Sequence, residues 1–301
     1  MFEGVHVANI TPFDSDYAID RGAYMAHAQW LADVGVNGLV PFGTNGEGPS
    51  VSMAEKLPVI EALFNSGPDV AIIPCVGQGN LPDTREMVRA LDTLPVSGIL
   101  VLPPYFFKPL EPEGLRRFYA SVLEGTHHPV LVYNIPAYSV EVPVEVVVDL
   151  AVWGVKDSGE DRAYGEHILS AGKGVLYGAE KWLWERLFAG APGIISGLGN
   201  FMPELLVDLY RLAQVGDEGA GQELSDRIEA VRSVIKTYTG AGVNKVLAEA
   251  RHGVHLGTVR PPLMPAPADF DPAAVLELAG LKAMPQQGYP LESEQTRFSR
   301  G

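Results

Sequence analysis

The sequence predicts an α/β fold, namely a TIM (β/α)8 barrel with a C-terminal helical extension. The first observation is that short apolar or β-branched runs alternate with longer segments of helical periodicity along most of the chain, a pattern typical of a parallel sheet. The second is that eight such runs can be counted, which favours a closed barrel over an open sheet. The third is the length of 301 residues, since one barrel takes roughly 250 residues and leaves room for an extension.

The candidate strands follow one another at regular intervals. They comprise residues 5–10, 38–42, 70–76, 98–102, 130–133, 152–155, 174–177 and 193–196. The segments between them are long enough for a crossover helix in nearly every case, for example residues 21–33, 53–65, 82–91 and 111–123. Because barrels carry their reactive groups at the carboxyl ends of the strands, polar residues that follow the strands should share one mouth.

The strand pattern stops near residue 203, and a helical region follows. Helices are predicted over residues 204–214, 218–238 and 243–250, then a proline-rich connector over 260–267 and a short helix within 272–281. We therefore expect a barrel over residues 1–215, a helical extension over 216–284 and an irregular or mobile tail over 285–301.

Composition excludes several classes of protein. The net charge of −15 comes from 22 Lys and Arg against 37 Asp and Glu, which disfavours nucleic acids and anionic membranes as partners. No apolar run is long enough to span a bilayer, and the N-terminus lacks the basic and apolar regions of a signal peptide. A cytoplasmic location is the resulting prediction.

Cysteine and histidine usage argues against disulfide and metal chemistry. The single Cys75 cannot form an intramolecular disulfide, and its apolar surroundings predict a buried structural thiol. His127 and His128 have no ligand partner at a suitable spacing, while Asp14, Asp16 and Asp20 resemble turn and cap residues. We predict no catalytic metal.

Lys156 is the residue whose position most clearly indicates a chemical role. It closes an apolar run and precedes the polar turn Asp157-Ser158-Gly159, so a strand end could deliver its side chain to a pocket. A partly desolvated ammonium loses its preference for the charged form, and the free amine can attack a ketone to give a Schiff base. The alternative is an ordinary surface lysine at a strand end.

A glycine-bracketed turn with Thr44 and Asn45 follows the second strand and runs toward the helix that begins near Met53. Backbone N–H groups in such a turn can bind a carboxylate without a formal cation. This would reconcile an acidic protein with an anionic substrate, although many glycine-rich turns only reverse the chain.

Tyr133 ends the fifth predicted strand. Its phenol could pass protons between a Schiff-base intermediate and the substrate if a neighbour such as the Thr44 hydroxyl orients it; a space-filling rim tyrosine is the alternative. Phe106, in the aromatic segment after the fourth strand, would form a wall of the pocket.

Five motifs occur in an order and spacing that resemble a known family. They are Thr11-Pro12-Phe13, Gly43-Thr44-Asn45-Gly46-Glu47, Tyr133-Asn134-Ile135-Pro136, Gly154-Val155-Lys156-Asp157-Ser158 and Gly193-Ile194-Ile195-Ser196. Together they are similar to those of the pyruvate-dependent class I aldolases that include dihydrodipicolinate synthase and N-acetylneuraminate lyase. The resemblance covers roughly residues 4–265.

The resemblance implies a TIM barrel, usually a homotetramer, that needs no added cofactor because Lys156 itself forms an imine with pyruvate or another 2-keto acid. It implies Tyr133 as the proton shuttle, assisted by Thr44, with Thr44 and Asn45 holding the carboxylate. It also implies that Ile195, Phe106 and Tyr138 border the substrate.

Two departures from the family bear on the substrate. Dihydrodipicolinate synthases carry a second tyrosine where this chain has Phe106, and an arginine where it has Tyr138. Tyr138 cannot imitate the forked guanidinium that meets a substrate carboxylate, so aspartate semialdehyde is disfavoured. Residues 48–57 and 260–262 look more like the 2-keto-3-deoxygluconate aldolase branch.

We therefore predict reversible cleavage of a 2-keto-3-deoxy sugar acid, or a similar hydroxylated 2-keto acid, to pyruvate and an aldehyde. Three alternatives stay open. They are a dihydrodipicolinate synthase, a dehydratase that uses the same imine, and a non-catalytic barrel that binds keto acids.

Overall fold

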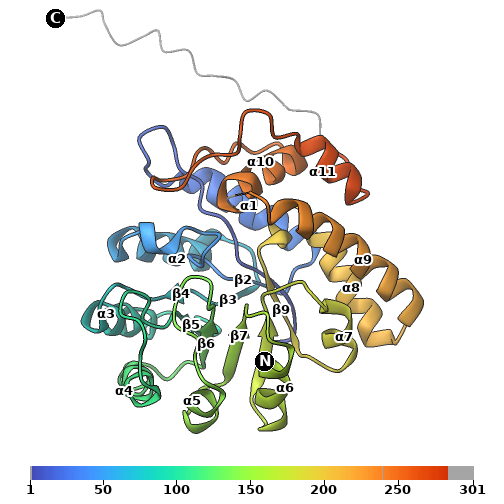
Figure 1. The fold of residues 1–301 in the computed structure, drawn as a ribbon. Coiled ribbons are helices and arrows are strands. Elements are labelled where there is room, and N and C mark those ends of the chain that lie inside the picture. The colour runs from blue at the N-terminus through green and yellow to red at the C-terminus, as the bar shows by residue number, and fades with distance from the viewer. Residues whose placement is uncertain (1, 239, 284–301) are drawn as a thin grey trace, which may run out of the picture.

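The computed structural model describes residues 2–238 and 240–283, and within them the predicted α/β barrel is confirmed (Figure 1). All neighbouring strands are parallel, in the order β3-β2-β1-β9-β8-β7-β6-β5-β4. The strands are β1 (Gly4–Val7), β2 (Gly38–Leu39), β3 (Ala71–Ile72), β4 (Cys75–Val76), β5 (Ile99–Val101), β6 (Val130–Asn134), β7 (Gly154–Asp157), β8 (Gly174–Tyr177) and β9 (Gly193–Ser196).

β3 and β4 are two halves of the single strand predicted over residues 70–76. Pro74 interrupts it, because proline has no N–H to donate to the ladder. The backbone nevertheless stays paired on both sides: the Cys75 N–H donates to the carbonyl of Pro41 at 2.9 Å, and the Leu100 N–H donates to that of Pro74 at 3.0 Å. These bonds close the barrel, so nine labelled strands correspond to the eight that the sequence predicts.

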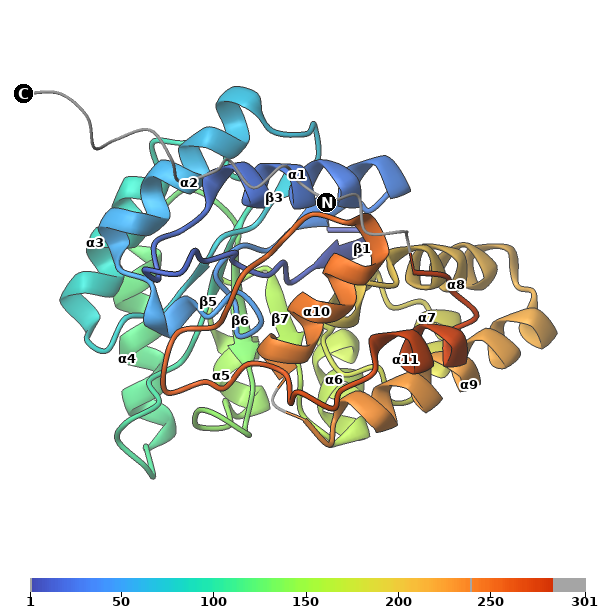
Figure 2. The same cartoon turned by 90° about the horizontal axis from the view of Figure 1, so that it is seen from above.

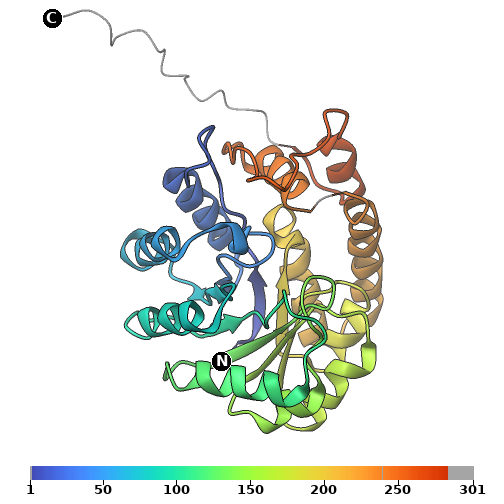
Figure 3. The same cartoon turned by 60° about the vertical axis from the view of Figure 1, so that its left-hand side comes forward.

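Eight helices alternate with the strands and pack around the outside of the barrel (Figure 3). They are α1 (Arg21–Val34), α2 (Met53–Ser66), α3 (Leu81–Leu91), α4 (Pro112–Leu123), α5 (Val144–Asp149), α6 (Arg162–Ser170), α7 (Leu183–Phe188) and α8 (Pro203–Val215). Asp20 caps α1 by accepting the Ala23 N–H at 2.9 Å, and Asp14 accepts two turn N–H groups, as the sequence predicted for these carboxylates.

Three more helices follow the barrel: α9 (Glu218–Ile235), α10 (Gly240–His252) and α11 (Pro272–Leu278). Figure 2 shows α10 beside the barrel, and a hydrogen bond from Asn244 of α10 to Asn45 fixes it at the carboxyl ends of the strands. The tail predicted over residues 285–301 lies outside the described residues.

The barrel interior is a packed core. Its buried apolar side chains are Phe2, Ala8, Val40, Ile73, Cys75, Leu100, Leu131, Tyr133, Ile135, Leu176 and Ile195. A larger cluster lies between the strands and the helices. Cys75 is buried and free, as predicted. Within the described ranges, no helix combines the length and the apolar character needed to cross a membrane.

Candidate active site

Lys156 lies inside β7, whereas the sequence placed it just beyond the strand end. The strand continues because β6 extends to Asn134 and pairs with it, Tyr133 opposite Lys156 and Asn134 opposite Asp157. Residues opposite each other in a parallel pair project from the same face, so the pairing sets Lys156 and Tyr133 side by side. Lys156 is only 3% exposed.

Three polar groups form a continuous row across the top of the barrel. The Lys156 Nζ donates to the Tyr133 Oη at 3.1 Å and lies 4.2 Å from the centre of that ring. The Tyr133 Oη also shares a hydrogen bond of 3.2 Å with the Thr44 Oγ1. The row therefore joins β6, β7 and the turn after β2, three segments that the sequence motifs singled out independently.

The turn formed by residues 43–47 presents free donors. Its own closure uses the Glu47 and Gly48 N–H groups, which donate to the carbonyls of Thr44 and Gly43 at 3.2 and 3.0 Å. Among the described residues, the N–H groups of Thr44 and Asn45 have no acceptor in the protein. The turn can therefore offer two adjacent donors to an anion.

The turn does not lead directly into α2. A short 3-10 helix, η1 (Gly48–Ser50), intervenes, and Ser52 and Glu55 form a capping box that satisfies the helix N-terminus. Any anion at the turn would therefore be held by the turn's own N–H groups.

α10 fixes the turn from the other side. The Asn244 amide donates to Asn45 at 2.7 Å, and the Lys245 Nζ donates to Glu47 at 2.8 Å. Glu47 is buried with φ of 53°, and its second carboxylate oxygen accepts the Arg260 N–H at 2.9 Å. Sequence reasoning missed these α10 residues, because no local spacing connects residues so far apart.

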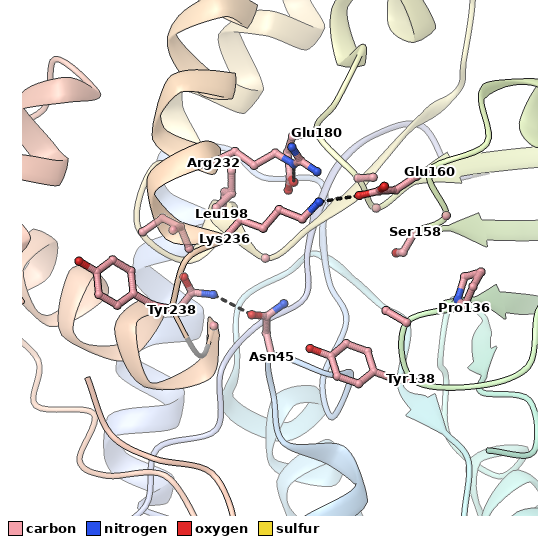
Figure 4. A pocket seen from close by; sticks show the side chains of 18 of the residues that line it. Asn45, Pro136, Tyr138, Ser158, Glu160, Glu180, Leu198, Arg232, Lys236 and Tyr238 are labelled. Carbon is pink, nitrogen blue, oxygen red and sulfur yellow. Dashed lines mark hydrogen bonds and ion pairs between the residues drawn. The ribbon is translucent and has the colours of Figure 1, made fainter. Parts of the chain in front are cut away.

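A cavity of about 660 Å³ is lined by Asn45 and Ser158, which lie next to the row in the chain (Figure 4). Its polar lining includes Asn45, Tyr138, Ser158, Glu160, Glu180, Arg232, Lys236 and Asn244. Gly178 also lines it, and a Cβ at that position would lie 2.8 Å from the Cε of Lys156. The glycine therefore leaves the lysine room at the cavity wall.

Glu180 is the chemically notable residue that the sequence analysis missed. It follows β8 and accepts a hydrogen bond of 2.5 Å from Ser196 Oγ, with the Arg232 Nε 3.8 Å away. Burial raises the pKa of this carboxyl, and the Ser196 hydroxyl only partly opposes the rise. Its position just beyond a strand end was the one signal that could have identified it.

Of the other residues predicted at the site, Tyr138 lines the cavity, whereas Ile195 and Phe106 do not. Tyr138 lines it and is 66% exposed. Ile195 is fully buried within the barrel and does not line the cavity. Phe106 is 81% exposed and packs edge-to-face on Phe107 at 5.3 Å, away from the cavity lining, so it forms no wall of the cavity in this chain. The loop directs the Phe106 ring outward in the single chain, and its place at the substrate pocket stays a prediction.

The model of the dihydrodipicolinate synthetase family matches residues 1–278. A 4-hydroxy-tetrahydrodipicolinate synthase from Rhizobium meliloti is 32% identical over 297 residues, covering 93% of this chain and 99% of that protein. One from Bartonella bacilliformis is 30% identical over 276 residues, covering 88% and 93%.

Solved structures agree with the sequence matches. A 2-keto-3-deoxygluconate aldolase from Sulfolobus, in complex with D-KDPG, is 26% identical, with a TM-score of 0.85 over 92% of this chain and 95% of that one. For the fold alone, a sialic acid aldolase from Ruminococcus gnavus has a TM-score of 0.85 at 23% identity, covering 93% and 96%. The chain therefore belongs to the dihydrodipicolinate synthetase family of pyruvate-dependent class I aldolases, as its five motifs predicted.

Proposed function

We propose that this protein is a Schiff-base aldolase that reversibly cleaves a 2-keto-3-deoxy sugar acid, or a similar hydroxylated 2-keto acid, to pyruvate and an aldehyde. The observation that carries the proposal is the row Lys156–Tyr133–Thr44 at the edge of a polar cavity. It combines an amine, a phenol and a hydroxyl within hydrogen-bonding distance, which is the arrangement of an activated nucleophile and its proton carrier.

Lys156 would supply the nucleophile. It is buried and donates to a phenol, and no carboxylate among the described residues forms an ion pair with it. Its free amine attacks the keto carbon, a proton moves from nitrogen to oxygen, and the hydroxyl leaves as water. The resulting iminium withdraws electrons from the neighbouring carbons, so no separate cofactor is needed.

Tyr133 would carry the protons. Its phenol protonates the departing hydroxyl as the imine forms, and the phenolate then takes the proton of the C4 hydroxyl as the C3–C4 bond breaks. The electrons of that bond form the enamine and the aldehyde leaves. The phenol then returns a proton to C3, and water releases pyruvate from Lys156. Thr44, at 3.2 Å, orients the phenol throughout.

The turn and the cavity would bind the two ends of the substrate. The N–H groups of Thr44 and Asn45 can hold the carboxylate next to the keto group. The polar cavity, with Ser158 and Glu180 on its wall, suits a chain of hydroxyl groups that donate and accept hydrogen bonds. The D-KDPG complex and a pyruvate complex of the similar Sulfolobus aldolase support this substrate class.

Synthesis from pyruvate and aspartate semialdehyde is the second candidate, because the curated relatives named above are 4-hydroxy-tetrahydrodipicolinate synthases. Against it, the position of the substrate-binding arginine holds Tyr138. A substrate panel separates the two: we expect sugar-acid turnover to exceed aspartate semialdehyde turnover, and the reverse order would assign the protein as a synthase.

The imine is tested by incubating the protein with pyruvate and borohydride and then mapping the adduct by mass spectrometry. We expect the reduced adduct on Lys156, and none in Lys156→Ala. Wild-type protein without an adduct on Lys156 would overturn the proposed mechanism.

We also propose a homo-oligomer, a tetramer by family resemblance. The outward Phe106 and Phe107 rings, 81% and 69% exposed, support a partner surface in this region. Light scattering tests the assembly. The cytoplasmic location stays a prediction.

A further inference from the structure

A second, much smaller cavity lies behind the Thr44–Tyr133 hydrogen bond. Its volume is about 20 Å³, enough for one water molecule, which needs roughly 10–15 Å³. The lining residues are Phe42, Gly43, Thr44, Gly48, Pro49, Lys56, Cys75, Val76, Gly77, Leu102 and Tyr133. None of them lines the large cavity, so the small cavity is a separate space that Thr44 and Tyr133 border.

Lys56 is the unusual member of this lining. It comes from α2, is 1% exposed, and its Nζ makes no hydrogen bond or ion pair to any described residue. Its Nζ lies 5.8 Å from the centre of the Phe42 ring. A buried ammonium without a partner is costly, and burial accordingly lowers the pKa of Lys56. A side chain kept at that cost beside a water-sized cavity, which the Thr44 and Tyr133 side chains also line, points to a role in proton transfer.

The neighbouring ionisable groups do not satisfy Lys56. Burial raises the pKa of the Cys75 thiol to about 11, so this thiol stays neutral. Glu55 is adjacent in sequence, but its carboxylate accepts from Ser52 and pairs with Arg260. Among the side chains that line the cavity, the Thr44 and Tyr133 hydroxyls are left to interact with Lys56 through a cavity water.

We propose that Lys56 is the far end of the proton relay, exchanging protons with Tyr133 through Thr44 and one water in this cavity. The proposal rests on the proposed function, because it presumes an imine at Lys156. In family members with a second tyrosine that phenol can complete the relay, whereas this chain has Phe106, which carries no hydroxyl, at the corresponding position.

The proton balance is simple. When the Tyr133 phenol has given its proton to the departing hydroxyl, the Lys56 ammonium passes a proton to the water, the water passes one to Thr44, and Thr44 passes one to the phenolate. Lys56 is then a neutral amine. Before Tyr133 takes the proton of the C4 hydroxyl, the same chain runs in reverse, which restores the Lys56 ammonium and regenerates the phenolate.

The test is exchange of the pyruvate methyl protons with D2O, followed by NMR, because each exchange requires the imine, the enamine and renewal of the proton on Tyr133. We expect Lys56→Met to keep the borohydride-trapped adduct on Lys156 but to exchange about 10²-fold more slowly, the lower end of what acid–base groups contribute. Exchange at the wild-type rate would overturn the role of Lys56.

Lys56→Arg separates proton transfer from charge. Arginine keeps the positive charge but does not release its proton in proteins, so we expect slow exchange and loss of the pH dependence that wild type shows. Wild-type exchange in Lys56→Arg would contradict the proposal, and this variant decides the matter if Lys56→Met does not fold.

Lys173→Met is the matched control. The Lys173 Nζ donates to the carbonyls of Leu150 and Val152 at 2.7 and 3.0 Å, at the opposite end of the barrel. Lys173→Met should lower the free energy of unfolding and leave the exchange rate of the pyruvate methyl protons unaltered. If wild type forms no adduct on Lys156, the proposed function itself fails, and that result is distinct from a normal exchange rate in Lys56→Met.

Discussion

Lys245 and Glu47 form an ion pair of 2.8 Å between side chains that are 1% and 0% exposed. The first belongs to α10 and the second to the turn that carries Thr44 and Asn45. The Lys245 Nζ also donates to the Thr258 carbonyl and lies 4.5 Å from the centre of the Phe13 ring. The helical extension is therefore part of the candidate site, because it holds the turn in place.

Replacing one partner of this ion pair should lower the free energy of unfolding more than replacing both partners. We expect Lys245→Met to lower the free energy of unfolding by about 3–5 kcal/mol, since it leaves the Glu47 carboxylate buried without its partner. The double variant with Glu47→Gln should recover part of the loss. Urea unfolding measures both. An exposed pair provides the control: Arg117→Ala, which removes the ion pair with Glu113, should cost less than about 1 kcal/mol. Equal losses in the two single variants would contradict this assignment.

Tyr133→Phe tests the centre of the row. The ring stays, so packing in the barrel core is preserved, but the hydroxyl that joins Lys156 and Thr44 is lost. We expect kcat for aldol cleavage to fall by about 10²–10⁴-fold, the usual contribution of a general acid–base group, with little change in thermal stability. Steady-state kinetics with a 2-keto-3-deoxy sugar acid measures it, and near-normal kcat would remove Tyr133 from the mechanism.

Gly178→Ala tests the space around Lys156. The added Cβ would lie 2.8 Å from the lysine Cε and would also contact Ser158 Oγ. We expect much slower adduct formation with pyruvate and borohydride, because the lysine must shift to relieve the contact.

Gly114→Ala is the matched control for that change. Gly114 lies in α4, and a Cβ there would meet no atom within 4 Å. The adduct should form normally. The free energy of unfolding should rise by about 0.5–1 kcal/mol, because alanine has a higher helix propensity than glycine. Similar adduct rates in Gly178→Ala and wild type would contradict the steric argument.

The sequence predicted the barrel because its signals are local. Alternating strands and helices can be read in short windows, and Thr44, Tyr133 and Lys156 each follow or end an apolar run, so the common mouth of a parallel barrel brings them together. Strand bounds were less accurate, since Lys156 belongs to β7 only through its pairing with Tyr133 on β6.

The missed features depend on tertiary contacts. Nothing near Lys245 in the sequence indicates Glu47, 198 residues away. Glu180 becomes unusual only when burial and Ser196 surround it. Phe106 follows a strand like the other site residues, yet its loop turns the ring outward. A position just after a strand end therefore predicts the region in which a residue lies. The packing of its loop decides the direction in which its side chain points.

Two histidines connect α1 and α10 through a row of hydrogen bonds. The Val254 N–H donates to the Nδ1 of His252, whose Nε2 lies 3.0 Å from the Nδ1 of His27, and the His27 Nε2 lies 3.0 Å from the Asn200 Oδ1. Each bond has one donor and one acceptor only if both rings are neutral. Burial lowers the pKa of His27 to about 4 and that of His252 to about 3.

The free energy of unfolding should therefore fall as the pH drops from about 6.5 toward 4, because the histidines bind protons in the unfolded chain but stay neutral in the folded one. Each histidine contributes a slope of up to about 1.4 kcal/mol per pH unit in that window and none well above it. His6, whose pKa burial also lowers to about 4, adds to the same slope. Urea unfolding between pH 4 and pH 8 measures it.

His252→Phe keeps an aromatic ring against Trp30, at 4.8 Å in the native protein, but removes one titrating group, so its slope should be shallower. A variant slope equal to that of wild type would show that His252 is not held neutral by the fold.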